Sequence, residues 1–142
     1  FEDCTSLTSV VIPEGVTEIG YDAFKGCASL TSVVIPSSVT KIGDEESWRG
    51  GVFDNCISLT SVVINAKIKK IDKMIFGNCT TLESITLPTG VNKIDASTFK
   101  DCTSLKVINV PAKKKDYYIQ RLPEEFHSLV VEMEAVKKAK KK

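Results

Sequence analysis

A repeated unit of 23 residues is the feature that most constrains how this chain folds. Its cysteines mark the period, because successive ones are separated by 23, 29, 23 and 23 residues. Four full copies share the consensus C-x-x-L-x-x-[VI]-x-[IL]-P-x-x-[VI]-x-x-I-[GD]-x-x-x-F-x-x. Phe1 stands three residues before Cys4, as Phe24 stands before Cys27, so the chain opens on the end of an earlier copy and is expected to be a fragment. A fixed period of this length predicts one supersecondary unit per copy, stacked into an array.

Each unit has the pattern of a short strand followed by a turn. In the first copy Leu7, Val10 and Ile12 define one buried face, and the proline that follows ends the strand because it cannot donate to a sheet ladder. Val16 and Ile19 form a second, shorter apolar pair. So short a unit cannot bury its own apolar face, so each strand is expected to pair in parallel with its equivalent one copy later. The predicted core consists of three ladders of equivalent residues: Cys4, Cys27, Cys56, Cys79 and Cys102; Leu7, Leu30, Leu59, Leu82 and Leu105; and Phe24, Phe53, Phe76 and Phe99.

The segments "SLTSVVIP", "VTEIG" and "AFKGC" resemble the leucine-rich repeats, and among them the BspA-type subfamily of bacterial surface proteins. The resemblance covers residues 1–111. It implies a mainly β solenoid, a right-handed coil with a parallel sheet on one face and short strands and helical turns on the other. It also implies an extracellular or cell-surface location and a role in binding host or neighbouring-cell proteins.

Three regions are expected along the chain. Residues 1–111 form the repeat array, with four full copies and partial first and last ones, residues 112–134 form a C-terminal cap, and residues 135–142 form a disordered basic tail. In the cap, Tyr118, Leu122 and Phe126 are expected to pack on the last coil, which would otherwise expose a slice of core. An aromatic binding site in the cap and an anchor to anionic lipid or polymer in the tail are the alternatives.

The cysteines admit two interpretations. Five cysteines in an extracellular protein suggest disulfides with one thiol left over. Stacked equivalents, however, keep a separation near 4.8 Å with parallel side-chain vectors, whereas a disulfide needs Cβ atoms about 3.5–4.5 Å apart. The geometry therefore favours a reduced, buried ladder. Zinc is not expected, because the close ligand pairs that it requires are absent from the sequence.

The sequence offers no catalytic constellation, so we expect no enzymatic activity, no metal and no cofactor. His127 has no serine, cysteine or carboxylate partner at a repeatable spacing, and there is no glycine-rich phosphate loop. Asp44, Glu45 and Glu46 lack the spacing of a calcium loop and indicate a solvated acidic turn instead. "NCT" at Asn78–Thr80 matches a glycosylation acceptor, but its cysteine belongs to the core row.

Charge and hydropathy exclude two further classes of partner. Leaving out the five lysines of residues 137–142 lowers the 19 basic residues to 14 against 18 acidic ones, a net of −4. This balance argues against nucleic-acid binding. Apolar runs of three or four residues are too short to span a membrane.

What remains as a candidate site is surface. Residues between the buried positions of the strands face outward and form two rows: Ser9, Ser32, Ser61 and Ser84; and Val11, Val34, Val63 and Thr86. An apolar stripe beside a polar one is typical of a protein-binding face, but β-branched residues also suit any strand.

The second candidate is an insertion. The second copy is six residues too long, and the surplus lies at about Asp44–Gly51, on the side or back of the solenoid. Trp48 and Arg49 in this stretch fit an exposed interaction knob, or a ring folded back over the phenylalanine ladder.

Three functions are compatible with these features. The first is a protein-binding or adhesion module, the second is a structural spacer that displays another domain, and the third is a carbohydrate-binding surface. Aromatic residues, which usually stack on sugars, are nearly absent from the outward rows, and this weakens the third. End-to-end self-association through the open N-terminal coil is possible.

Overall fold

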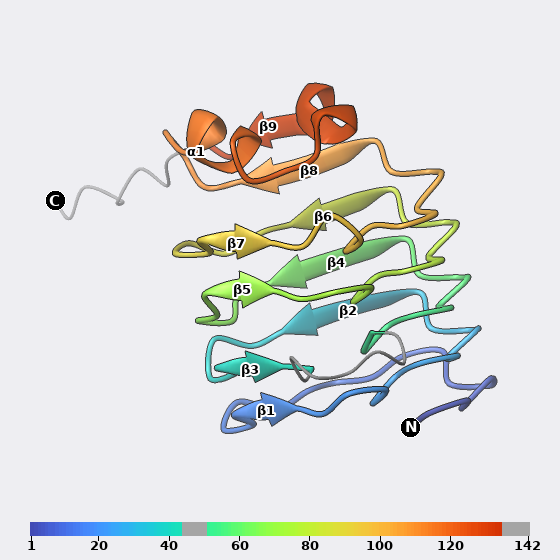
Figure 1. Cartoon of the computed structure of the whole chain (residues 1–142). Coiled ribbons are helices and arrows are strands. Elements are labelled where there is room, and N and C mark those ends of the chain that lie inside the picture. Colours follow the sequence, from blue (N-terminus) through green and yellow to red (C-terminus); the bar gives the residue numbers. More distant parts are fainter. Residues whose placement is uncertain (44–50, 135–142) are drawn as a thin grey trace, which may run out of the picture.

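The computed structural model describes residues 1–43 and 51–134. Within these residues the chain forms coils that lie one above another from the N-terminus to the C-terminus (Figure 1). Trp48, Arg49 and the acidic residues 44–46 lie outside the described residues, as does the basic tail, so the interpretations given for them stay predictions.

A five-stranded parallel sheet runs along one side of the stack. Its order is β2-β4-β6-β8-β9, and each neighbouring pair is joined in parallel. Buried and outward residues alternate along β2, as the period-2 pattern requires. The strands are β2 (Ser32–Ile35), β4 (Ser61–Ile64), β6 (Ser84–Thr86), β8 (Val107–Val110) and β9 (Val130–Glu132).

The second apolar pair of each unit forms a strand of two residues. These strands pair in parallel as β1 with β3 and β5 with β7, and the two pairs are separate sheets. Their bounds are β1 (Glu18–Ile19), β3 (Lys41–Ile42), β5 (Lys70–Ile71) and β7 (Lys93–Ile94). The insertion follows β3, which is the last strand of the first short sheet.

The core is built from vertical rows of equivalent side chains. Phe24, Phe53 and Phe76 stack face to face, with 5.3 Å and 5.5 Å between successive ring centroids. Cys56 and Leu59 are wholly buried in the same coil as Phe53. The register of the phenylalanine row is intact across the insertion, so the added residues leave the coil core unchanged.

The first coil differs from the sequence prediction. Residues 7–12 are not in a strand, although Thr31 N donates to Thr8 O at 3.3 Å, and the main sheet begins at β2. Cys4 and Leu7 are only partly buried, unlike their equivalents in later coils. The described chain places a neighbouring coil on one face of this unit only, so it lacks the second packing partner that buries the others.

The segment after the last repeat packs on β8. It contains α1 (Lys115–Ile119), a 3₁₀ helix at Glu124–Leu129 and β9, which pairs with β8. Tyr118, Leu122 and Phe126 are buried, at 1%, 5% and 9% exposure. This segment closes the C-terminal end of the stack (Figure 1). Among the described residues, no helix combines the length and the apolar character that crossing a membrane requires.

Candidate binding surfaces

The outward rows of the main sheet are in register from coil to coil. Ser32 lies beside Ser61, and Ser61 beside Ser84. In the second row Val34 lies beside Val63, and Val63 beside Thr86. The structure therefore brings six of the eight predicted sheet-face residues into two parallel lines. Ser9 and Val11 are exposed but belong to the coil that forms no strand.

The second row is the more apolar one at its N-terminal end. Val11 is 89% exposed and Val34 is 53% exposed, whereas Val63 is half-buried. Exposed β-branched side chains in one line give a narrow apolar strip on an otherwise polar face. We call the line from Val11 through Val34, Val63 and Thr86 the valine row.

Both rows continue beyond the residues predicted from the repeats. Val107 lies beside Ser84, and Asn109 beside Thr86. Val131, in β9, lies beside Asn109 and is 48% exposed. Extended in this way, the valine row passes through the polar Thr86 and Asn109 and ends at the apolar Val131. Only the β8 positions follow from the repeat alignment, because β9 lies outside the repeats.

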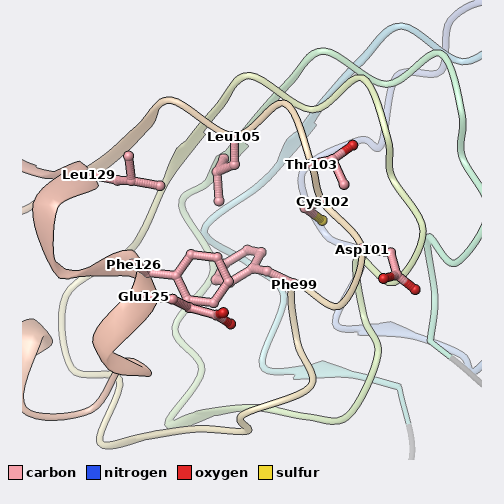
Figure 2. Close-up of a pocket in the computed structure, with 8 residues that line it drawn as sticks. All are labelled: Phe99, Asp101, Cys102, Thr103, Leu105, Glu125, Phe126 and Leu129. Carbon is pink, nitrogen blue, oxygen red and sulfur yellow. The ribbon is translucent and has the colours of Figure 1, made fainter.

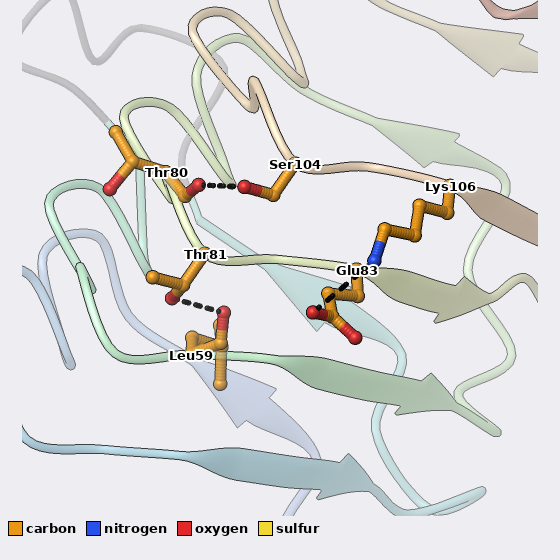
Figure 3. A network of polar contacts seen from close by, with 6 residues as sticks. All are labelled: Leu59, Thr80, Thr81, Glu83, Ser104 and Lys106. Carbon is orange, nitrogen blue, oxygen red and sulfur yellow. Dashed lines mark hydrogen bonds and ion pairs between the residues drawn. The ribbon is translucent and has the colours of Figure 1, made fainter.

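Polar side chains next to the main sheet link one coil to another and form the border of this face. Thr81 Oγ1 donates to Leu59 O at 3.0 Å, and Ser104 Oγ donates to Thr80 O at 2.7 Å (Figure 3). Lys106 and Glu83 form an exposed ion pair at 3.7 Å. The hydroxyls are used to satisfy backbone carbonyls, so they are part of the scaffold.

A shallow cavity of about 450 Å³ lies at the seam between the last coil and the C-terminal segment. The rings of Phe99 and Phe126 and the carboxyl-bearing residues Asp101 and Glu125 are among the residues that line it (Figure 2). Cys102 retains 8% exposure here, while Cys56 and Cys79 are wholly buried. The seam thus leaves the C-terminal end of the core slightly open beside Cys102.

The five cysteines form a row of free thiols, and four of them, Cys27, Cys56, Cys79 and Cys102, each donate to a phenylalanine carbonyl of the preceding coil. Cys56 Sγ donates to Phe24 O at 3.1 Å, and Cys79 Sγ donates to Phe53 O at 3.2 Å. Burial raises the pKa of Cys56 to about 12. A hydrogen bond with the Cys102 side chain and burial raise the pKa of the Cys79 thiol. Thiols held protonated in this way are poor nucleophiles.

The remaining chemical candidates are used by the fold. His127 Nε2 lies 2.8 Å from Leu122 O, which fixes the ring on its own turn. Asn78, in the glycosylation motif, donates its amide to Asp54 Oδ1 at 2.9 Å. The buried Tyr118 hydroxyl donates to Pro88 O, so this aromatic residue holds the C-terminal segment on the array. Across residues 1–43 and 51–134, no group of three or more histidine, cysteine or acidic side chains is arranged to hold a metal ion.

The chain is similar to known repeat proteins over most of its length. The family model for the BspA type leucine rich repeat region matches residues 1–121 in six copies. A solved leucine-rich repeat protein from Eubacterium ventriosum is 27% identical, with a TM-score of 0.64, and the match covers 72% of this chain and 26% of that one. A solved leucine rich cell surface protein from Faecalibacterium prausnitzii is 31% identical, with a TM-score of 0.55, over 78% of this chain and 34% of that one. The chain therefore spans about a quarter to a third of these structures. A comparison with curated proteins finds no match.

Proposed function

The chain belongs to the BspA-type leucine-rich repeat family, and from this premise we propose that it is a non-enzymatic protein-binding and adhesion module. We place it in a bacterial cell-surface protein, outside the cell, where its partner is a protein of a host or of a neighbouring cell. The observation that carries the proposal is the valine row. It presents Val34 at 53% exposure in β2, the edge strand of the main sheet, beside Val63 in β4, which is paired on both sides.

The physical argument rests on preorganisation. Strand residues held by parallel ladders lose little conformational freedom when a partner covers them, so most of the gain from burying their surface is kept as affinity. The apolar part of the row supplies that gain, and the serine row beside it supplies hydrogen-bonding groups for orientation. Solenoids commonly bind along such extended faces.

The test is a binding screen of the full chain against extracellular proteins and glycans, followed by variants on the partner that it finds. Val34→Glu and Val63→Glu place a charge in the middle of the apolar strip. Each is expected to weaken binding on the order of 100-fold, because the new carboxylate is desolvated by the partner and the apolar contact is lost.

Ile57→Glu is the matched control. Ile57 is 49% exposed, close to the value for Val34, but it lies in the turn after Cys56 rather than in a strand of the main sheet. Its change is expected to leave both affinity and melting temperature unaltered. Equal binding by Val34→Glu and the unmodified chain would remove the sheet face as the site. If the chain binds none of the proteins and glycans in the screen, the result would favour the structural spacer instead.

A further inference from the structure

A second surface feature lies on the short-strand side of the solenoid. Between β3 and β5, where the two short sheets are not joined, the structure has a cleft of about 370 Å³. We call it the lysine cleft, because four of the residues that line it are Lys41, Lys67, Lys69 and Lys70, together with the carboxylate of Asp72. Among the described residues, four lysines and one aspartate therefore line this cleft, in a chain whose body carries a net of −4 without the tail lysines.

The positive charge extends along the stack. Lys70 lies beside Lys93 in the parallel pair of β5 and β7. Lys41, Lys67, Lys69 and Lys93 are exposed, so their ammonium groups are open to a ligand. The coils of a parallel array advance by about 4.8 Å, which spreads these charges over a line of about 10 Å.

A carboxyl group beside this line is held in its ionised form. The pKa of Asp95, two residues after Lys93, lies below its usual range, first because the Ser97 side chain donates to it at 2.7 Å and also because Lys73 and Lys93 are close. The hydrogen bond is the larger cause, and the two lysines act in the same direction.

We propose that the lysine cleft binds a linear polyanion, a polymer of sulfate or phosphate groups. Lysine is a point charge without the planar fork that arginine uses to grip a single phosphate, so each contact contributes little and many in a line are needed. A polymer meets that need, because every lysine it neutralises releases counterions from the chain of anions. The cleft is independent of the valine row, so this proposal does not depend on the protein-binding function.

The experiment measures the affinity of the full chain for fluorescein-labelled dextran sulfate by anisotropy at 50 and 200 mM salt. The five tail lysines at 137–142 are replaced by glutamine in every sample, because a run of lysines also attracts polyanions. In that background, Lys41→Gln, Lys67→Gln and Lys69→Gln are combined. The triple variant is expected to bind on the order of 100-fold more weakly, at about fivefold per lysine. The slope of the logarithm of the association constant against the logarithm of salt concentration is expected to become shallower by about two.

The matched control replaces Lys100, Lys113 and Lys115 by glutamine. These three lysines are exposed, and replacing them removes the same charge as the cleft variant. They do not line the cleft. The control is expected to bind within about threefold of its parent, because distant charges are screened. A repeat with polyphosphate of matched length identifies which polymer, sulfated or phosphorylated, binds more tightly. Equal losses in the two triple variants, or no binding once the tail lysines are neutral, would overturn the proposal; unchanged melting curves exclude unfolding as the cause.

Discussion

Phe126 meets Phe99 edge to face, with 5.6 Å between ring centroids and 69° between ring planes. The four ring pairs before it, from Phe1 to Phe99, are stacked within 10° of parallel. The turned ring thus ends the phenylalanine ladder, and it comes from a segment that lies outside the repeat pattern. At the other end Phe1 is 69% exposed.

Truncating the two ends of this ladder is expected to have unequal effects on stability. Phe126→Ala removes a buried ring and opens the last coil, so the free energy of unfolding should fall by about 3 kcal/mol. Phe1→Ala removes a mostly exposed ring and should cost less than about 1 kcal/mol. Urea unfolding followed by far-UV circular dichroism measures both. Similar losses for the two variants would mean that Phe126 does not close the core.

Alkylation is expected to separate Cys4 from the other four thiols. Cys4 is partly buried in the incomplete first coil, while Cys27, Cys56, Cys79 and Cys102 lie in the core. With iodoacetamide at pH 8, Cys4 should react first and the others at least about 100-fold more slowly, because they must wait for the coil to open. Peptide mass spectrometry against time gives each rate. All five should react in denaturant without reductant, and fewer than five reactive thiols there would contradict the unbridged ladder.

The stability of the fold is expected to fall at alkaline pH. The pKa of Cys56 rises from 9.0 to about 12 on folding because burial disfavours the thiolate. The unfolded chain therefore releases this proton first, and the stabilisation present below pH 9 is lost as the pH rises to 12. Urea midpoints measured with reductant from pH 8 to 11 should decline. Cys56→Ser, which is close in size and can still donate to Phe24 O but does not ionise in this range, should show a smaller decline. Parallel curves would rule out this thiol as a contributor.

The residue before each cysteine is expected to tolerate glycine but not valine. Asn55 has φ = 62° and is exposed, and its N–H donates to Gly77 O at 2.9 Å. A β-branched side chain is strained in this left-handed region, so Asn55→Val should cost about 1–2 kcal/mol. Asn55→Gly keeps the left-handed conformation accessible and should change the free energy of unfolding by only about a few tenths of a kcal/mol. Thermal melts of the two variants measure both effects. An equal loss of stability in the two variants would point to a lost side-chain contact instead of backbone strain.

The sequence predicts the interior of this fold well because each core position is repeated. Leu59 and Leu82 are wholly buried at the positions that the period assigns. The register of Val34 with Val63 also follows from the period, since parallel strands of equal units pair equivalent residues. The same spacing argument predicted the unbridged cysteines. The sequence also carries a signal of backbone conformation: aspartate, glycine or asparagine precedes every cysteine, and all five of these residues have positive φ.

The features that escaped prediction are those that depend on the ends and on tertiary placement. The sequence pattern of residues 7–12 equals that of later units, yet this segment forms no strand in the structure. Val131 extends the valine row from a segment with no repeat register to align. The lysine cleft brings Lys41 close to Lys67, Lys69 and Lys70 from the next coil at a gap between short sheets. A periodic pattern says which residues are equivalent, but not where a sheet is interrupted.

The hydrogen bonds between coils have a consequence for how the chain is made. The bond from Cys79 to Phe53 spans 26 residues, and that from Ser104 to Thr80 spans 24. Each coil needs only its immediate successor to complete its contacts, so no strand waits for a partner from the far end of the chain. A growing polypeptide can therefore complete the contacts of one coil for every two dozen further residues that leave the ribosome, so that at any moment the most recently formed coil is the one still open to aggregation.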